Sequence, residues 1–147
     1  MEWLRQEHQP LWRSCVAGVL IIITRLNQAM APFGIDLYEF EILLQLHDAE
    51  DNQLRMSQLS KRIALSRSRL THTVQRMEDK GLVRRVSGND DGRGVWATLL
   101  DDGRALLDKA APAHAKALMD SLIEPVGNVG FTACGMAMQA VIDAHEG

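Results

Sequence analysis

Cysteine and aromatic residues are scarce in this chain of 147 residues. Two cysteines, Cys15 and Cys134, cannot form the disulfide framework of a small secreted domain, so we expect free thiols in a cytoplasmic protein. The N-terminus lacks the basic lead and apolar run of a signal peptide. The longest apolar run, Cys15–Ile23, is too short to cross a bilayer and predicts a buried helix, so we expect no membrane partner.

Sequence motifs of catalysis and metal binding are also missing. The chain has no glycine-rich phosphate loop, no Gly-x-Ser-x-Gly and no convincing pair of carboxylates, which argues against an enzyme. Its five histidines show no close ligand spacing such as His-x-x-x-His. We therefore expect neither a metal site nor a cofactor.

Positive charge, by contrast, is concentrated in one stretch. Between Arg55 and Arg93 there are ten Lys and Arg residues and four acidic residues, a local charge of +6. Because the whole chain carries a charge of -3, the remainder sums to -9. A basic patch in an acidic surround attracts the phosphate backbone of a nucleic acid to one face only.

A helix-turn-helix pattern lies inside this basic stretch. Residues 56–63 predict a short helix with Ser57 as its N-cap, and residues 64–66 a tight connection. The next helix, 67–80, has Ser66 as its N-cap and ends at Gly81. Its buried stripe is predicted to be Leu70, Val74 and Met77. Two short helices joined in this way are typical of DNA-binding proteins.

A β-hairpin follows the second helix. After Gly81 the apolar period changes to two, which predicts strands at 82–86 and 95–100 around a glycine-rich tip. Arg93 at this tip is flanked by glycines, which would let it enter the narrow minor groove, with Asp91 holding its guanidinium. A simple turn with a structural Asp–Arg pair is the alternative.

The remaining segments predict helices that flank this module. A first helix spans about 9–30, with an apolar surface broad enough to suggest a dimer interface. Asp36 is expected to cap the next helix, and residues 48–53 to form a loop. A long helix at 103–123, capped by Asp101 and Asp102, and a last one at 132–144 complete the chain. Prolines and glycines at 125–130 are expected to separate those two.

The helix at 67–80 supplies the candidate DNA-reading residues, because its N-terminal half would enter the major groove. An ordinary solvated helix face is the alternative, and Arg76 has the further alternative of pairing with Glu78 or a wing acid. The reading candidates are Ser66, Arg67, Ser68, Arg69, Thr71, His72, Gln75 and Arg76. The candidates for DNA backbone contacts are Lys61, Arg62, Arg84 and Arg85.

The chain resembles the MarR family of bacterial transcriptional regulators. The resemblance covers about 37–114 and is carried by Gly-Leu-Val-Arg-Arg at 81–85 followed by Asp-Gly-Arg-Gly at 91–94. It implies a homodimer, with a winged helix-turn-helix in each subunit, that binds pseudo-palindromic double-stranded DNA, often until a small effector releases it. It also matches Arg93 to the wing arginine, Asp91 to its orienting acid and 66–75 to the reading helix.

Together these inferences predict a mainly α fold with a small β-hairpin wing. Residues 35–100 would form the winged helix-turn-helix domain, and residues 1–34 with 101–147 the helical dimerisation region made by the N- and C-terminal helices. We expect a repressor of transcription. A small-molecule effector pocket is suggested for Trp12, Met30, Phe33, Phe40 and His114, although such residues are more often plain core.

A ligand- or thiol-redox-sensing protein of the same fold, with altered or lost DNA binding, is the second hypothesis. One branch of the family senses peroxides through an N-terminal cysteine, and such chemistry needs an accessible thiolate with polar neighbours. Cys15 is followed by the apolar and small residues 16–19. A buried helix cysteine is therefore the favoured interpretation of Cys15, and likewise of Cys134.

Overall fold

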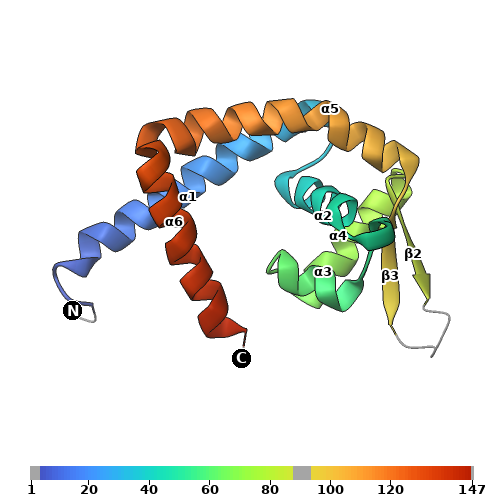
Figure 1. Ribbon diagram of the computed structural model, residues 1–147, viewed down its shortest axis with the longest axis horizontal. Helices are drawn as coiled ribbons and strands as arrows, with labels where there is room; N and C mark the ends of the chain where they lie inside the picture. The colour runs from blue at the N-terminus through green and yellow to red at the C-terminus, as the bar shows by residue number, and fades with distance from the viewer. Residues whose placement is uncertain (1–3, 88–93, 147) are drawn as a thin grey trace. The chain divides into compact units, whose positions relative to one another are not determined.

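The computed structural model describes residues 4–87 and 94–146, and Figure 1 labels its elements. Most of these residues are helical, and the strands form one small antiparallel sheet, which confirms the predicted fold class. The helices are α1 (His8–Met30), α2 (Leu37–Asp48), α3 (Met56–Arg62), α4 (Arg67–Asp79), α5 (Asp101–Leu118) and α6 (Glu124–His145). The strands are β1 (Gln53–Arg55), β2 (Val83–Ser87) and β3 (Val95–Leu99).

The chain divides into two compact units, the central unit (residues 30–112) and the terminal unit (residues 1–29 and 113–147). Of the nineteen buried hydrophobic side chains among the described residues, eighteen lie in the central unit. The first turns of α5 belong to this core, because Gly103, Leu107 and Ala110 are buried. The central unit therefore has a hydrophobic core of its own, as an independently folding DNA-binding domain would need.

Helix starts in the central unit are set by side-chain caps. The Asp36 carboxylate accepts a hydrogen bond from the Glu39 N–H at 2.8 Å, and the Ser66 hydroxyl accepts one from the Arg69 N–H at 3.3 Å. Both caps confirm the prediction. The cap predicted at Ser57 is wrong: α3 already begins at Met56, and the Gln58 side chain instead accepts from the Arg55 N–H at 3.1 Å.

Two glycines allow α4, the sheet and α5 to meet. Gly81 ends α4 with a φ of 73°, a left-handed conformation that favours glycine, as predicted for this position. At Gly103 a Cβ atom would lie 2.2 Å from the backbone oxygen of Leu82. Only glycine lets α5 approach the start of β2 this closely. Asp101 and Asp102, predicted to cap this helix, lie in the first turn of α5 rather than before it. Their negative charges there interact favourably with the positive end of the helix dipole.

The sheet has the strand order β1-β3-β2, with both pairings antiparallel. Strands β2 and β3 confirm the predicted hairpin, and in their register Arg85 lies opposite Ala97. Strand β1 corrects the sequence analysis, which ended a loop at Gln53 and began a helix soon after. A strand of three residues is too short to display an alternating pattern, and only its pairing with β3 defines it.

The terminal unit has almost no core of its own. Fourteen of the fifteen large hydrophobic side chains that are exposed among the described residues lie in it, on α1, α6 and the turn before α6. Cys15 and Cys134 are exposed as well, so the prediction that both are buried is wrong for the single chain. The reason is that α1 and α6 turn their apolar residues outward, where a second subunit would have to cover them.

The apolar character of α1 extends beyond the run that the sequence analysis considered. Residues 8–33 form a helical segment long and apolar enough to cross a membrane by length and composition. The expectation based on the nine-residue run was therefore too narrow, because the helix carries further apolar residues on both sides of that run, such as Leu11, Leu26 and Met30. One such helix near an N-terminus is weak grounds for a membrane span, since helices of soluble proteins meet the same criterion.

The last helix begins earlier than predicted. A π-helical turn at Met119–Ile123 leads directly into α6, which starts at Glu124 instead of residue 132. Pro125 lies in the first turn of α6, a position that tolerates proline, so it does not break the helix. Gly127 has a non-helical backbone with a φ of 71°, so two helical stretches meet at this residue. The predicted break at 125–130 is therefore confirmed at Gly127, although Pro125 does not cause it.

Candidate nucleic-acid interface

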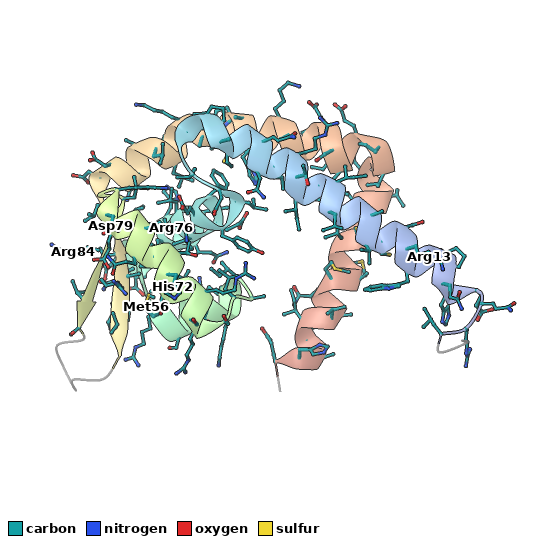
Figure 2. All side chains as sticks on the ribbon, turned by 180° about the vertical axis from the view of Figure 1, so that it is seen from behind. Arg13, Met56, His72, Arg76, Asp79 and Arg84 are labelled. Carbon is teal, nitrogen blue, oxygen red and sulfur yellow. The ribbon has the colours of Figure 1, made fainter. Side chains whose placement is uncertain are left out.

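Helix α4 presents a polar, basic face to solvent. Leu70, Val74 and Met77 are buried as predicted, and Thr73 joins them. Opposite this stripe, residues spaced by three and four lie on one exposed surface. Figure 2 shows His72, Arg76 and Asp79 along this helix. The exposed reading candidates are Ser66, Arg67, Ser68, Arg69, Thr71, His72, Gln75 and Arg76.

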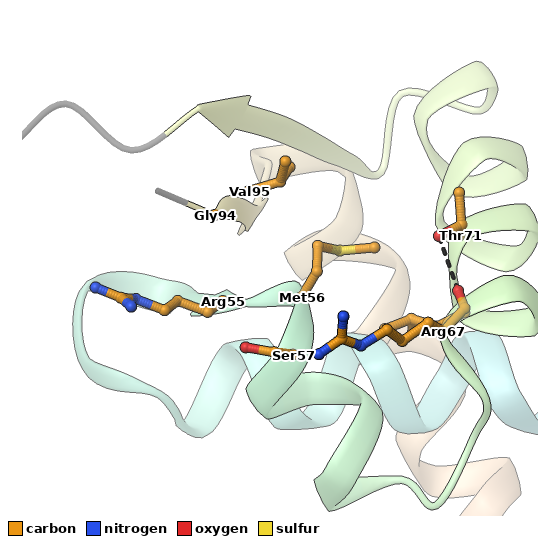
Figure 3. Close-up of a pocket in the computed structure, with 8 residues that line it drawn as sticks. Arg55, Met56, Ser57, Arg67, Thr71, Gly94 and Val95 are labelled. Atoms are coloured by element: carbon orange, nitrogen blue, oxygen red, sulfur yellow. Dashed lines mark hydrogen bonds between the residues drawn. The ribbon is translucent and has the colours of Figure 1, made fainter. Parts of the chain in front are cut away.

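Thr71 and Arg69 are held by contacts within α4 and with α2. The Thr71 hydroxyl donates to the backbone oxygen of Arg67 at 2.8 Å (Figure 3), which turns it toward the helix. The guanidinium of Arg69 lies 5.4 Å from the centre of the Tyr38 ring, a cation–π distance. Arg69 is therefore steered by an aromatic side chain that the sequence analysis did not consider.

Arg76 pairs with acids that neither alternative named. Its Nε lies 3.4 Å from Glu39 Oε1 and its Nη2 lies 3.5 Å from Asp36 Oδ2. Among the described residues Glu78 instead pairs with Arg85, so the prediction of Glu78 as the partner of Arg76 is wrong, while the wing acids lie outside the described residues. Lys80 completes the network: its Nζ lies 2.8 Å from Glu39 Oε2 and donates to the backbone oxygen of Gly34 at 2.8 Å.

Glu39 is the centre of this network. Its side chain is only 3% exposed, whereas those of Arg76 and Lys80 are 51% and 39% exposed. A buried carboxylate needs compensation by charge and hydrogen bonds, and two cations from α4 provide it. The network joins the N-terminal end of α2 to the C-terminal half of α4. Nothing in the spacing of these residues along the sequence indicated it, since about forty residues separate the partners.

Arg85 on β2 is bound by α4 rather than free for DNA phosphates. Its Nε donates to Glu78 Oε1 and its Nη2 donates to Gln75 Oε1. The Gln75 amide in turn donates to Asp79 Oδ1 at 3.0 Å. Arg84, the preceding residue, is exposed; Figure 2 shows it on β2. Two adjacent arginines that look equivalent in the sequence thus have different surroundings.

A hollow of about 320 Å³ lies beside the N-terminal half of α4 (Figure 3). Arg55 and Arg67 are among the residues that line it, and the guanidinium of Arg55 lies 5.2 Å from the centre of the Trp96 ring. Two arginines beside one hollow suit a phosphate oxygen. The residues that line it are Arg55, Met56, Ser57, Arg67, Leu70, Thr71, Gly94 and Val95. Sequence reasoning counted Arg55 in the basic stretch but missed it as a site residue, because it assigned that position to no helix or strand.

Of the other predicted DNA-contacting residues, the structure describes some and not others. Lys61 and Arg62 are exposed at the end of α3. Asp91 and Arg93 lie outside the described residues, so their predicted roles at the wing stay predictions. Gly94, where the description resumes, has a φ of 80°.

The five predicted effector residues are divided between the two units. Met30 and Phe40 are buried in the central unit, where Phe33 is half-buried, and Trp12 is 60% exposed on α1. His114 is half-buried in the terminal unit, and this burial lowers the pKa of its imidazole below 6.5. Their role in an effector pocket stays a prediction.

A hollow of about 620 Å³ within the terminal unit is lined by other residues: Ile21, Arg25, Gln28, Ala29, Ala117, Asp120 and Ser121. In the part of the chain that the structure describes, no three His, Cys, Asp or Glu side chains gather as metal ligands would.

Comparison with known proteins gives consistent matches along the whole chain. A model of the MarR family matches residues 33–94. AbsC, a MarR family transcriptional regulator from Streptomyces coelicolor, is 30% identical with a TM-score of 0.89, and the match covers 98% of this chain and 97% of AbsC. Sco3205, a MarR family regulator from the same organism solved in complex with DNA, is 29% identical with a TM-score of 0.92, covering 100% of this chain and 92% of Sco3205.

A curated relative agrees with these structures. The HTH-type transcriptional repressor YetL of Bacillus subtilis is 28% identical over 119 residues, covering 74% of this chain and 71% of YetL. All three relatives are regulators of transcription rather than enzymes.

Proposed function

Because this chain belongs to the MarR family of transcriptional regulators, we propose that it is a cytoplasmic repressor that binds a pseudo-palindromic operator as a homodimer. The observation that carries the proposal is the exposed basic face of α4, backed by a buried stripe and joined to a hairpin. In a helix-turn-helix protein this second helix enters the major groove, and the paired half-sites lie about 10 bp apart.

The residues divide into those that set position and those that specify sequence. Lys61, Arg62 and Arg84 are exposed cations around the helix-turn-helix and would contact phosphates. Ser68, His72 and Gln75 share one face of α4 and would meet base edges in the major groove. Arg93 would add a minor-groove contact from the wing. Release by a small-molecule effector belongs to the proposal, without an assigned effector.

Selection from a fragmented genomic library tests this function and the wing together. Wild type is expected to recover a palindromic sequence, and Arg93→Ala to bind that sequence more weakly while keeping the wild-type melting temperature, because a wing arginine contacts DNA and not the core. Lys109→Ala, an exposed cation on α5 outside the helix-turn-helix, serves as the control and should bind like wild type. Equal operator affinity of Arg93→Ala and wild type would refute the role of the wing. Recovery of no sequence above background, with any effector removed by refolding, would refute operator binding.

A further inference from the structure

The side-chain amide of Gln75 is held at both ends by neighbouring side chains. Its oxygen accepts a hydrogen bond from Arg85 Nη2, and its nitrogen donates one to Asp79 Oδ1 at 3.0 Å. A guanidinium only donates and a carboxylate only accepts, so these two partners fix which end of the amide is oxygen and which is nitrogen.

Each end of this amide keeps one hydrogen-bonding position. The oxygen has a second lone pair and the nitrogen has a second hydrogen. A glutamine reads adenine with one lone pair and one hydrogen, which bind N6 and N7 of the base. We propose that Arg85 and Asp79 are positioning residues that hold the Gln75 amide ready to read an adenine in each half-site. This inference rests on the proposed function, in which α4 enters the major groove.

The position of Arg85 on β2 fits this role. Side chains alternate along a strand, so Arg85 shares a face with Val83, which is buried in the core, whereas Arg84 lies on the opposite face. The side chain of Arg85 is 24% exposed, and its second anchor, Glu78, is 26% exposed. Arg85 is therefore bound in place before DNA arrives, and it supports Gln75 without reaching the phosphates that the sequence analysis assigned to it.

Fixing the amide in advance favours specific binding. A free glutamine loses rotamer freedom when it contacts a base, and a side chain that is already ordered avoids most of that cost. It also presents its donor and acceptor in one order only. Thymine, cytosine and guanine do not offer the complementary acceptor and donor at the same place in the major groove.

The test measures how strongly each variant prefers one base over the others at each position of the operator. If Arg85 and Asp79 only stabilised the fold, their loss would not change the preference at a single base pair alone. Affinities are determined for the recovered operator and for all single base-pair changes in its half-site. Gln75→Ala and Arg85→Met are each expected to lose about tenfold of the preference for adenine at the same base pair. The double variant should lose no more than Gln75→Ala alone, because Arg85 acts through Gln75.

Matched variants separate positioning from phosphate binding. Arg84→Met, on the opposite face of the same strand, should weaken binding to every operator variant by one factor and reduce the salt slope by about 1. Asp79→Asn keeps an oxygen that can accept from Gln75 and should keep the adenine preference, whereas Asp79→Leu should lose it. The Asp79 pair also covers the case in which Arg85→Met does not fold.

Three results would overturn the inference. Arg85→Met could behave like Arg84→Met, weakening all operators uniformly; Gln75→Ala could leave every base preference unchanged; or Asp79→Leu could keep the adenine preference. In each of these cases wild type still binds its operator specifically, so the proposed function stands. If wild type itself bound all DNA sequences equally well, the proposed function would be refuted, and this inference with it.

Discussion

At the scale of single residues, the use of a cation depends on which acids the fold brings to it. Arg76, Lys80 and Arg85 all belong to the basic stretch, yet each is bound by side chains of the central unit. Lys61, Arg62 and Arg84 are exposed and suit DNA phosphates better. Charge counting along the sequence correctly located the basic surface but could not separate these two groups, because their partners are distant in sequence.

The Glu39 network yields a prediction on stability. Lys80→Met should lower the free energy of unfolding by about 1 kcal/mol, since Glu39 keeps Arg76 and the lost partner is partly exposed. The double variant Arg76→Met/Lys80→Met should lower it by about 3 kcal/mol, because it leaves a buried carboxylate without a cation.

Urea unfolding at one fixed protein concentration measures both values, which matters because the stability of a dimer depends on concentration. Lys109→Met, which removes an exposed cation from α5, is the control and should change little. Equal stability of the double variant and the control would show that Glu39 is satisfied in another way.

At the scale of elements, neighbouring residues in the sequence predicted helices and their caps better than they predicted the pairing of distant strands. The caps at Asp36 and Ser66, the end of α4 at Gly81 and the hairpin of β2 and β3 followed from nearby residues. Strand β1 and the early start of α6 did not. β1 exists through its distant partner β3, and Pro125 is compatible with the first turn of a helix, where a sequence pattern alone cannot distinguish it from a break.

The exposed apolar residues of α1 and α6 lead to a prediction on dimer formation. Leu20 is 59% exposed on α1 in the single chain, among further exposed apolar residues of the terminal unit. If a second subunit covers this surface, Leu20→Glu places a charge in the interface and should shift the dimer to monomers. Lys109→Glu introduces the same side chain at an exposed polar position of α5 and should remain dimeric.

Sedimentation equilibrium over a range of protein concentrations distinguishes these outcomes. A monomeric wild type would contradict the assembly outright. A dimeric Leu20→Glu would mean that the interface lies elsewhere on the terminal unit, for example on α6 around the exposed Met136.

At the scale of the whole molecule, charge and exposed apolar surface are segregated. The basic stretch falls in the central unit, whereas the apolar residues exposed on the single chain gather in the terminal unit. This division matches a protein in which one unit binds DNA and the other joins two subunits. The family resemblance followed from the motifs at 81–85 and 91–94, whereas the operator sequence and the effector depend on contacts that no motif specifies.

The affinity of wild type for its selected operator and for an unrelated duplex, measured from about 50 to 200 mM salt, tests the central claim most directly. The two reading helices and their exposed cations should give a steep dependence, with a loss of about a thousandfold or more over this range. The operator should bind at least about a thousandfold more tightly than the unrelated duplex. A flat salt dependence, or equal affinity for the two duplexes, would contradict the claim that α4 is a sequence-reading helix.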